Sequence, residues 1–184
     1  MFDTDAFVEA CKKAVGEGQK AVREVVAEAV SDPAAVIKAF GEPASAGIVP
    51  LYRAPDLTII HFTWAPYMSL MPHNHQMFSV VGVYDGREDN VFWRRLEGTI
   101  EAAGADSLGA ANVATLGRDI IHSVVNPIGK MTSALHVYGG DFFAPEKPRS
   151  EWDHETLQER PWDVDGVRRR FKDAEARSKV AAAF

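Results

Sequence analysis

Between about residue 57 and residue 138 the sequence is a series of short β-patterned runs separated by turn residues. The runs are rich in β-branched and aromatic residues, and Gly, Pro, Asn and Asp lie between them. They cover residues 57–64, 77–84, 90–96, 100–102, 113–116, 120–125 and 133–138. Short strands at this spacing are typical of a β-sandwich or barrel. This pattern constrains the fold more than any other feature of the sequence.

Helical patterns flank this β-rich region on both sides. Residues 4–30 carry apolar residues at three- and four-residue steps, which predicts amphipathic helix, and a glycine-containing break at 16–18 divides it into two. Ser31-Asp32-Pro33 predicts the start of a third helix that ends at Phe40. Residues 165–180 have a charged helical pattern. We therefore divide the chain into an N-terminal helical segment that packs on the barrel, the barrel, and a partly helical C-terminal extension: residues 1–45, 46–145 and 146–184.

The composition excludes several classes of function. The net charge of the 184 residues is −6 and basic residues form no long run, which argues against nucleic-acid binding. A single cysteine, Cys11, excludes an intrachain disulfide framework and a cysteine-based zinc site. The N-terminus lacks the basic start and apolar run of a signal peptide, and no apolar stretch reaches membrane-spanning length. We therefore expect a cytoplasmic protein that binds neither nucleic acid nor membranes.

Three histidines in the β-rich region could converge on one metal ion. His73 and His75 are two residues apart, and residues two apart on a β-strand point to the same face. His122 lies in a short apolar run that is also predicted to be a strand. Neutral imidazole suits iron, zinc, copper and nickel, and three protein ligands with open positions are typical of a catalytic site. The alternative is a chance pair on a half-exposed strand. The flanking apolar runs, Gly86 and the third histidine favour the metal site.

The spacing of these residues resembles the two motifs of the cupin superfamily. His73-x-His75, with a glycine eleven residues later, is similar to the first motif, and His122 followed by Asn126 resembles the second. The first motif often has an acidic residue as a fourth ligand, where this chain has Ser79, so the resemblance implies a three-histidine variant. It also implies the fold class: all-β, a cupin (double-stranded β-helix, jelly-roll) barrel with N-terminal helices.

Within the cupins, several segments resemble cysteine dioxygenase and its bacterial relatives, including 3-mercaptopropionate dioxygenase. The similarity spans roughly residues 50 to 155. It includes the stretch from Trp64 to His75, the strand after it, the segment around His122 and the strand at 135–141. The resemblance implies Fe(II) as the cofactor, held by His73, His75 and His122, with dioxygen and a small thiol as the other partners.

The same resemblance assigns a catalytic role to His136 and Tyr138, which share one face of a predicted strand. In the family, Ser, His and Tyr alternate along this strand, and the tyrosine can donate a hydrogen bond to oxygen at the metal. Here Ala134 replaces the serine, so we expect His136 to take a water or a backbone carbonyl as its partner, or to stay loosely held. No cysteine lies near the site to crosslink the tyrosine. The alternative is that both residues are a stacked pair in the core.

Two arginines are candidates for binding a substrate carboxylate, because a guanidinium binds a carboxylate through two parallel hydrogen bonds. Arg53 resembles the anchoring arginine of the cysteine-specific enzymes, and Arg149 resembles that of the mercaptopropionate group. Arg94 and Arg95 are further candidates without a family match. The alternative for each is a surface ion pair. His61 and His154 lack ligand spacing, and we expect neither to bind the metal.

Together these features predict a thiol dioxygenase that oxidises a small thiol carboxylate, of the cysteine or 3-mercaptopropionate type, to its sulfinate. Two other functions remain open at this point. The first is another enzyme on the same scaffold, either a three-histidine dioxygenase that cleaves carbon–carbon bonds or an isomerase or hydrolase with another metal. The second is a non-enzymatic, metal-dependent sensor of small molecules. A homo-oligomer is compatible with the sequence, which does not fix the number of subunits.

Overall fold

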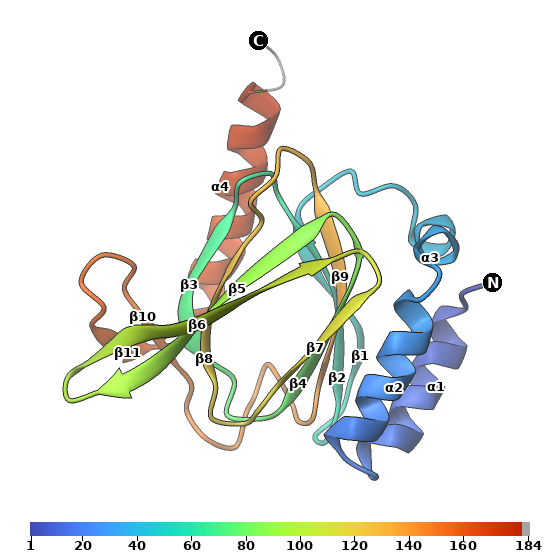
Figure 1. Ribbon diagram of the computed structural model, residues 1–184, viewed down its shortest axis with the longest axis horizontal. Helices are drawn as coiled ribbons and strands as arrows, with labels where there is room; N and C mark the ends of the chain where they lie inside the picture. The colour runs from blue at the N-terminus through green and yellow to red at the C-terminus, as the bar shows by residue number, and fades with distance from the viewer. Residues whose placement is uncertain (182–184) are drawn as a thin grey trace.

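Two antiparallel β-sheets face each other in the computed structural model, which describes residues 1–181 (Figure 1). The five-stranded sheet has the order β1 (Gly47–Arg53), β2 (Thr58–Trp64), β9 (Thr132–Tyr138), β4 (Ser79–Asp85) and β7 (Asn112–Leu116). The six-stranded sheet has the order β11 (Glu159–Pro161), β10 (Ser150–Trp152), β3 (Ser69–Asn74), β8 (Ile121–Val125), β5 (Arg87–Leu96) and β6 (Thr99–Gly109).

The chain crosses repeatedly from one sheet to the other. Strands β2, β3, β4 and β5 alternate between the sheets, β5 and β6 form a hairpin within one of them, and β7, β8 and β9 alternate again. This is the double-stranded β-helix, or jelly-roll, arrangement. Alternate side chains of each strand point into the space between the sheets. Residues from sequence-distant strands such as β3, β5, β8 and β9 therefore meet there.

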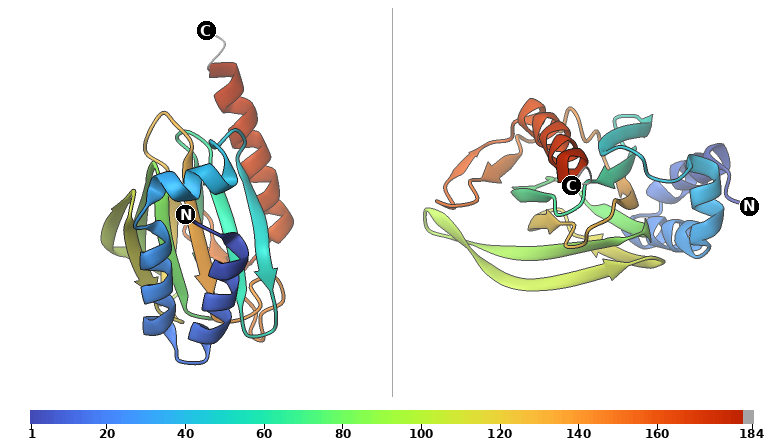
Figure 2. Two further views of the ribbon diagram at one scale, coloured as in Figure 1. Left: turned by 90° about the vertical axis from the view of Figure 1, so that its right-hand side faces the viewer. Right: turned by 90° about the horizontal axis from the view of Figure 1, so that it is seen from above.

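Three helices cover the outer face of the five-stranded sheet: α1 (Thr4–Val15), α2 (Gln19–Val30) and α3 (Pro33–Phe40) (Figure 2). Asp3 caps α1 and Asp32 caps α3, each accepting a hydrogen bond from a backbone N–H of the first turn. The strongest contacts to the sheet come from α2, which lies on β4 and β7. Its approach is close because Gly82 in β4 has no side chain beneath Val26 and Val30.

A fourth helix, α4 (Val164–Ala181), lies on the other side of the molecule (Figure 2). It contributes Val167, Phe171 and Ala174 to the apolar core between the two sheets. The Phe171 ring lies 5.0 Å from the Trp64 ring between centroids and 6.1 Å from the Phe62 ring. The C-terminal extension therefore closes one side of the space in which the three histidines lie.

The expectation of an all-β fold is wrong in one respect. The four helices contain 27% of the chain, and the sheets form an open sandwich instead of a closed barrel. The helices are integral to the fold because the outer face of the five-stranded sheet is itself apolar. Ile59, Val80, Leu135 and Val137 are fully buried in one core cluster with the residues of α1 and α2.

The glycine of the first motif has a steric role. Gly86 adopts a φ of 81° at the turn from β4 to β5, a conformation that favours glycine. A side chain at this position would also collide with Thr132, whose hydroxyl accepts a hydrogen bond from the backbone N–H of Arg87.

No helix within residues 1–181 is both long enough and apolar enough to cross a membrane.

Candidate metal centre

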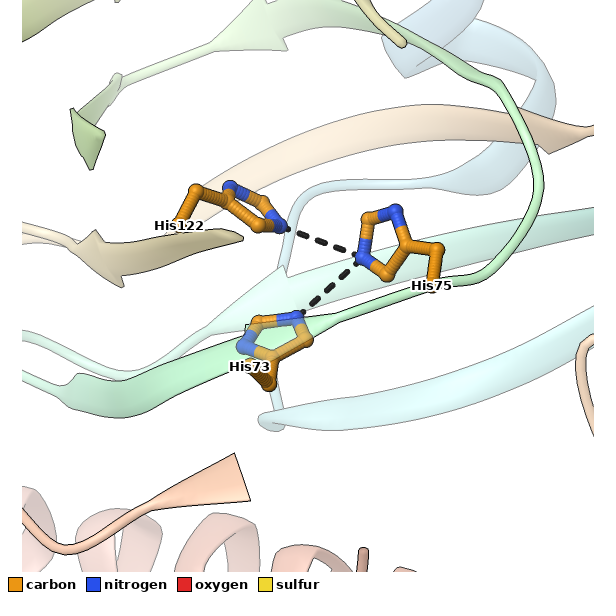
Figure 3. A group of neighbouring side chains, drawn as sticks. All are labelled: His73, His75 and His122. Carbon is orange, nitrogen blue, oxygen red and sulfur yellow. Dashed lines mark hydrogen bonds between the residues drawn. The ribbon is translucent and has the colours of Figure 1, made fainter. Parts of the chain in front are cut away.

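The three histidines of the predicted site meet in the space between the sheets (Figure 3). His73 lies in β3, and His122 lies directly opposite it in the paired strand β8. His75 follows the last residue of β3 and precedes Gln76, which has a φ of 61°. His75 is therefore just outside the strand, but its ring still turns to the same point as that of His73.

The Nε2 atoms of the three rings face one another. His75 Nε2 lies 3.2 Å from His73 Nε2 and 3.1 Å from His122 Nε2. Dashed lines mark the two contacts in Figure 3. Each Nδ1 has its own partner: the backbone oxygen of Met71 at 2.9 Å from His73, Ser79 Oγ at 3.2 Å from His75, and Asn90 Oδ1 at 2.7 Å from His122. The oxygens of Met71 and Asn90 only accept hydrogen bonds, so the Nδ1 atoms of His73 and His122 carry the protons. Their Nε2 lone pairs then point at the shared centre.

This geometry fits a divalent metal ion. Two nitrogen ligands about 2.1 Å from one ion and at roughly a right angle are about 3.0 Å apart, close to the observed separations. Burial lowers the pKa of His73 and His75 well below the usual histidine value, and it lowers the pKa of His122 to about 3. All three rings are therefore neutral at pH 7, as metal ligands must be.

Ser79 occupies the position at which the first motif often has an acidic ligand. Its side chain is fully buried and its hydroxyl lies against Nδ1 of His75, on the side of the ring away from the shared centre. Among the described residues, no carboxylate or thiolate joins the three histidines in a ligand group. The donor set is therefore histidine alone, as the sequence predicts.

His136 and Tyr138 lie side by side next to this cluster. The Tyr138 ring lies 5.1 Å from the His75 ring between centroids, and its hydroxyl is 3.2 Å from His136 Nδ1. Burial raises the pKa of Tyr138, so its hydroxyl keeps its proton. His136 and Tyr138 therefore lie within hydrogen-bond distance of each other and beside His75.

The structure gives His136 a different partner from the expected one. Its Nε2 atom lies 3.2 Å from the carboxylate of Glu88, a residue with no exposed surface. Ala134 has no hydroxyl at the position where the family has serine, but the Glu88 carboxylate reaches His136 from β5 in the other sheet. Sequence reasoning missed Glu88 and Asn90. The available signal was a pair of polar residues two apart, at the start of a strand that follows Asp85-Gly86.

Arg149 is buried beside the cluster. It is 4% exposed and lies between the rings of Phe142 and Trp162, 4.3 and 4.1 Å from their centroids. Its Nε donates to the backbone oxygen of Asn74, the residue between the first two histidines, at 2.8 Å. Its Nη2 is buried and has no hydrogen-bond partner among the described residues. Burial lowers the pKa of Arg149 to about 10, and the group still carries a positive charge at pH 7.

The other candidate cations lie away from the cluster. Arg53 has a half-exposed side chain that pairs with Asp141 through two parallel hydrogen bonds of 2.9 Å. Arg94 pairs with Glu101 and Arg95 with Glu159, both on the surface. His61 lies 2.6 Å from the Tyr84 hydroxyl and stacks on Phe40, and His154 is exposed. Of the four arginines considered, the structure brings only Arg149 to the site.

The three histidines, His136 and Tyr138 line a narrow cavity between the sheets. Its volume is about 20 Å³, enough for about one water molecule. The remaining walls are apolar: Ile48, Phe62, Trp64, Leu70, Val124, Phe142, Trp162 and Val167. Trp162 and Val167 belong to the C-terminal extension. A ligand larger than about one water molecule therefore requires some of these walls to move.

Comparisons with known proteins concern the fold alone. No protein-family model and no curated protein sequence matches this chain. A Bacillus halodurans structure matches with 13% identity and a TM-score of 0.50, covering 61% of this chain and 80% of that one. An RmlC-like cupin family protein with a double-stranded β-helix fold, from Methanocaldococcus jannaschii, has 9% identity and a TM-score of 0.47, covering 55% and 86%. Oxalate oxidase has 12% identity and a TM-score of 0.42, covering 54% of this chain but only 53% of its own. The structural neighbours are cupin-type proteins.

Proposed function

We propose that this protein is a non-haem, Fe(II)- and oxygen-dependent thiol dioxygenase that converts a small thiol carboxylate to its sulfinate. The observation that carries the proposal is the donor set of three neutral histidines without an acidic ligand among the described residues. A divalent ion bound by neutral ligands keeps its full double charge. In a buried, low-dielectric site such a charge favours an anionic substrate.

A thiolate is an anion well suited to this centre. Coordination to a metal removes the proton of a thiol that would otherwise titrate near about pH 8.5. The cavity walls opposite the histidines are apolar, which suits a short hydrocarbon chain more than a polar one. Both features support a small, largely aliphatic thiol.

Arg149 supports a carboxylate on the same substrate. A buried guanidinium with an unpartnered Nη2 has a strong requirement for an acceptor, because leaving a buried charged donor unpaired is costly. Its positive charge contributes to the lowered pKa of all three histidine ligands, after burial itself, so the group lies close enough to act on the site. Arg149 does not itself line the cavity, but its guanidinium stacks on Phe142 and Trp162, which do, so a carboxylate bound there would lie next to the cavity.

The chemistry balances without a further reductant. In the overall reaction, RSH + O2 gives RSO2H, both oxygen atoms are transferred to sulfur, and the four electrons that sulfur loses reduce dioxygen. A ferrous ion held by His73, His75 and His122 would supply the redox chemistry and bring the two reactants together. The residues of the chain hold and orient: Arg149 binds the carboxylate, and Tyr138, held by His136, offers its hydroxyl beside His75.

The test is oxygen uptake by the iron-loaded protein, purified without a histidine tag. We expect uptake with a thiol carboxylate, equal to the thiol consumed, and a product heavier by two oxygen atoms. A matched thiol with an amide in place of the carboxylate should react poorly because it cannot neutralise Arg149. A 1,3-diketone should not react.

Two outcomes would contradict this function. Rapid oxidation of the diketone, with no thiol oxidation, would make the protein a carbon–carbon-cleaving cupin. Tight binding of the thiol with no oxygen uptake under any condition would make it a metal-dependent binding protein or sensor.

A further inference from the structure

A carboxylate with no exposed surface lies between the two sheets, in a position that the proposed function does not require. Glu88 accepts hydrogen bonds at both of its oxygens: Trp64 Nε1 donates to Oε2 at 2.9 Å, and Asn90 Nδ2 donates to Oε1 at 3.2 Å. His136 Nε2 lies 3.2 Å from Oε2. Burial alone would raise the pKa of Glu88, but the neighbouring His136 and the hydrogen bonds from His136 and Asn90 outweigh it, and the pKa is lowered. The group is therefore an anion that can only accept.

Through His136, the Glu88 carboxylate affects the position of the Tyr138 hydroxyl. Because the carboxylate accepts only, His136 must carry a proton on Nε2. Its Nδ1 then faces the Tyr138 hydroxyl at 3.2 Å. The carboxylate thus performs from the other sheet the task for which the related enzymes use a serine on the same strand: it fixes the ring orientation and the protonated nitrogen of the histidine.

Through Asn90, the same carboxylate affects the tautomer of His122. Since Glu88 Oε1 accepts from the amide nitrogen of Asn90, the amide oxygen must point the other way, toward His122. That oxygen lies 2.7 Å from His122 Nδ1 and can only accept, so Nδ1 is protonated and Nε2 is free to bind a metal. Because Glu88 can only accept, it fixes the orientation of the Asn90 amide, and that amide fixes which nitrogen of His122 carries the proton.

We infer that Glu88 is a positioning residue that sets both sides of the centre at once, fixing the metal-binding tautomer of His122 through Asn90 and the orientation of Tyr138 through His136. The inference relies on the proposed function only for the presence of a metal ion at the three histidines. It does not depend on the substrate being a thiol. Partners of this kind typically change metal affinity about 10- to 100-fold when they are removed.

Glu88→Gln tests this direction of hydrogen bonding with almost no change in shape. The indole N–H of Trp64 can only donate, so the glutamine oxygen must stay at Oε2 and its NH2 must face Asn90. Two NH2 groups cannot hydrogen-bond to each other, and the Asn90 amide turns over. Its NH2 then faces His122 Nδ1, which must give up its proton, and the ring shifts to the tautomer that is protonated on Nε2.

A second substitution should restore the pattern. In the double variant Glu88→Gln, Asn90→Asp, the glutamine NH2 donates to one oxygen of the carboxylate introduced at position 90, and the other oxygen of that carboxylate accepts from His122 Nδ1. The total charge of the pair is unchanged. Asp89→Asn is the matched control, because it removes a carboxylate from the neighbouring position of β5 whose partner is the surface residue Arg87.

Two measurements are needed on each variant. The first is the ring ¹⁵N NMR shifts of His122 in the metal-free protein, which report the tautomer. The second is the affinity for Fe(II) alone, titrated anaerobically against a competing chelator. We expect Glu88→Gln to shift His122 toward the Nε2–H tautomer and to weaken Fe(II) binding by about 10- to 100-fold. The double variant and Asp89→Asn should match the parent in both.

The outcomes separate this inference from the proposed function. An unchanged tautomer in Glu88→Gln overturns the inference, even if iron binding weakens, since loss of charge alone would then explain the weaker binding. The inference is also overturned if the double variant does not recover the His122 tautomer and the Fe(II) affinity of the parent. If Glu88→Gln does not fold, the double variant is compared directly with the parent, and the same outcome decides. Absence of iron binding by the parent contradicts the metal centre, whereas the tautomer measurement still tests Glu88.

Discussion

Arg149 and Arg53 have the same side chain in opposite surroundings, and this difference leads to a specific prediction. Arg149 is buried beside the three histidines, and its Nη2 has no hydrogen-bond partner within residues 1–181, whereas Arg53 is half-exposed and already paired with Asp141. We expect Arg149→Ala to raise KM for a thiol carboxylate more than tenfold, because loss of a desolvated charge-assisted pair typically costs about 2–5 kcal/mol. Arg53→Ala should change KM little. Steady-state oxygen uptake measures both.

Arg149→Lys is the informative intermediate variant. Lysine keeps the charge but lacks the planar fork that binds a carboxylate through two parallel bonds, so we expect only partial recovery. An increase in KM for Arg53→Ala with none for Arg149→Ala would mean that the substrate carboxylate binds at Arg53 instead of Arg149. No change in either variant would argue against a carboxylate on the substrate.

The three histidines that meet between the sheets could be predicted from the sequence, and the polar residues Glu88 and Asn90 that contact their surroundings could not. His73, His75 and His122 follow from strand periodicity and from a third histidine in an apolar run, and Arg149 from a local resemblance. Glu88 and Asn90 acquire their roles only when β5 pairs with β8 and β9 faces them from the other sheet. Short-range patterns carry no information on such long-range pairing, so the sequence could not indicate that Asn90 contacts His122 and Glu88 contacts His136.

At the scale of elements, the contact between α2 and the five-stranded sheet depends on one glycine. A Cβ at Gly82 would lie 2.5 Å from Val26 Cγ1 and 2.9 Å from Val30 Cγ1, both on short, branched side chains that cannot move aside. We expect Gly82→Ala to lower the free energy of unfolding by about 1–3 kcal/mol, the usual cost of overpacking. Urea denaturation of the metal-free protein measures this difference.

Gly47→Ala is the control for the loss of glycine itself. Gly47 also lies in a strand of this sheet, but a Cβ there would meet nothing within 4 Å. Its stability should equal that of the parent or exceed it slightly. Equal urea midpoints for Gly82→Ala and the parent would mean that α2 can shift outward freely.

Most helices and strands follow from local pattern, and the exceptions have a physical cause. The predicted helices and β-rich runs correspond to the four helices and to β2, β4 and β5 to β9. The sequence pattern did not identify β1, which contains Pro50, as a strand. β1 is an edge strand with a register shift after Pro50, where a proline is tolerated. The short strands β10 and β11 exist through pairing with each other and with β3, which no local signal reports.

For the whole molecule, the buried histidines determine how stability depends on pH. Burial lowers the folded-state pKa of His61 to about 4 and of His122 to about 3, and those of His73 and His75 also fall well below the usual value. Between these values and about 6.5, the unfolded chain binds protons that the folded chain does not. The metal-free protein should therefore lose stability as the pH falls from about 6.5 toward 4.

His61→Gln isolates one part of this dependence, away from the metal centre. Each such histidine contributes at most about 1.4 kcal/mol per pH unit to the slope of unfolding free energy against pH. Glutamine can still hydrogen-bond the Tyr84 hydroxyl, but it does not titrate, so the slope should decrease by about that amount. Urea unfolding at several pH values gives the slope. A stability that is flat down to pH 4.5 in the parent would contradict the burial of neutral histidines.

The metal content of the protein tests the account most directly, because the proposed chemistry and the role of Glu88 both require an ion at the three Nε2 atoms. Elemental analysis of protein purified without a histidine tag and loaded anaerobically with Fe(II) should give about one ion per chain in the parent and in His61→Ala. His122→Ala should retain almost none, since two imidazoles hold such an ion far less tightly than three. A full equivalent of iron in His122→Ala, or an equal loss in His61→Ala, would contradict the three-histidine centre.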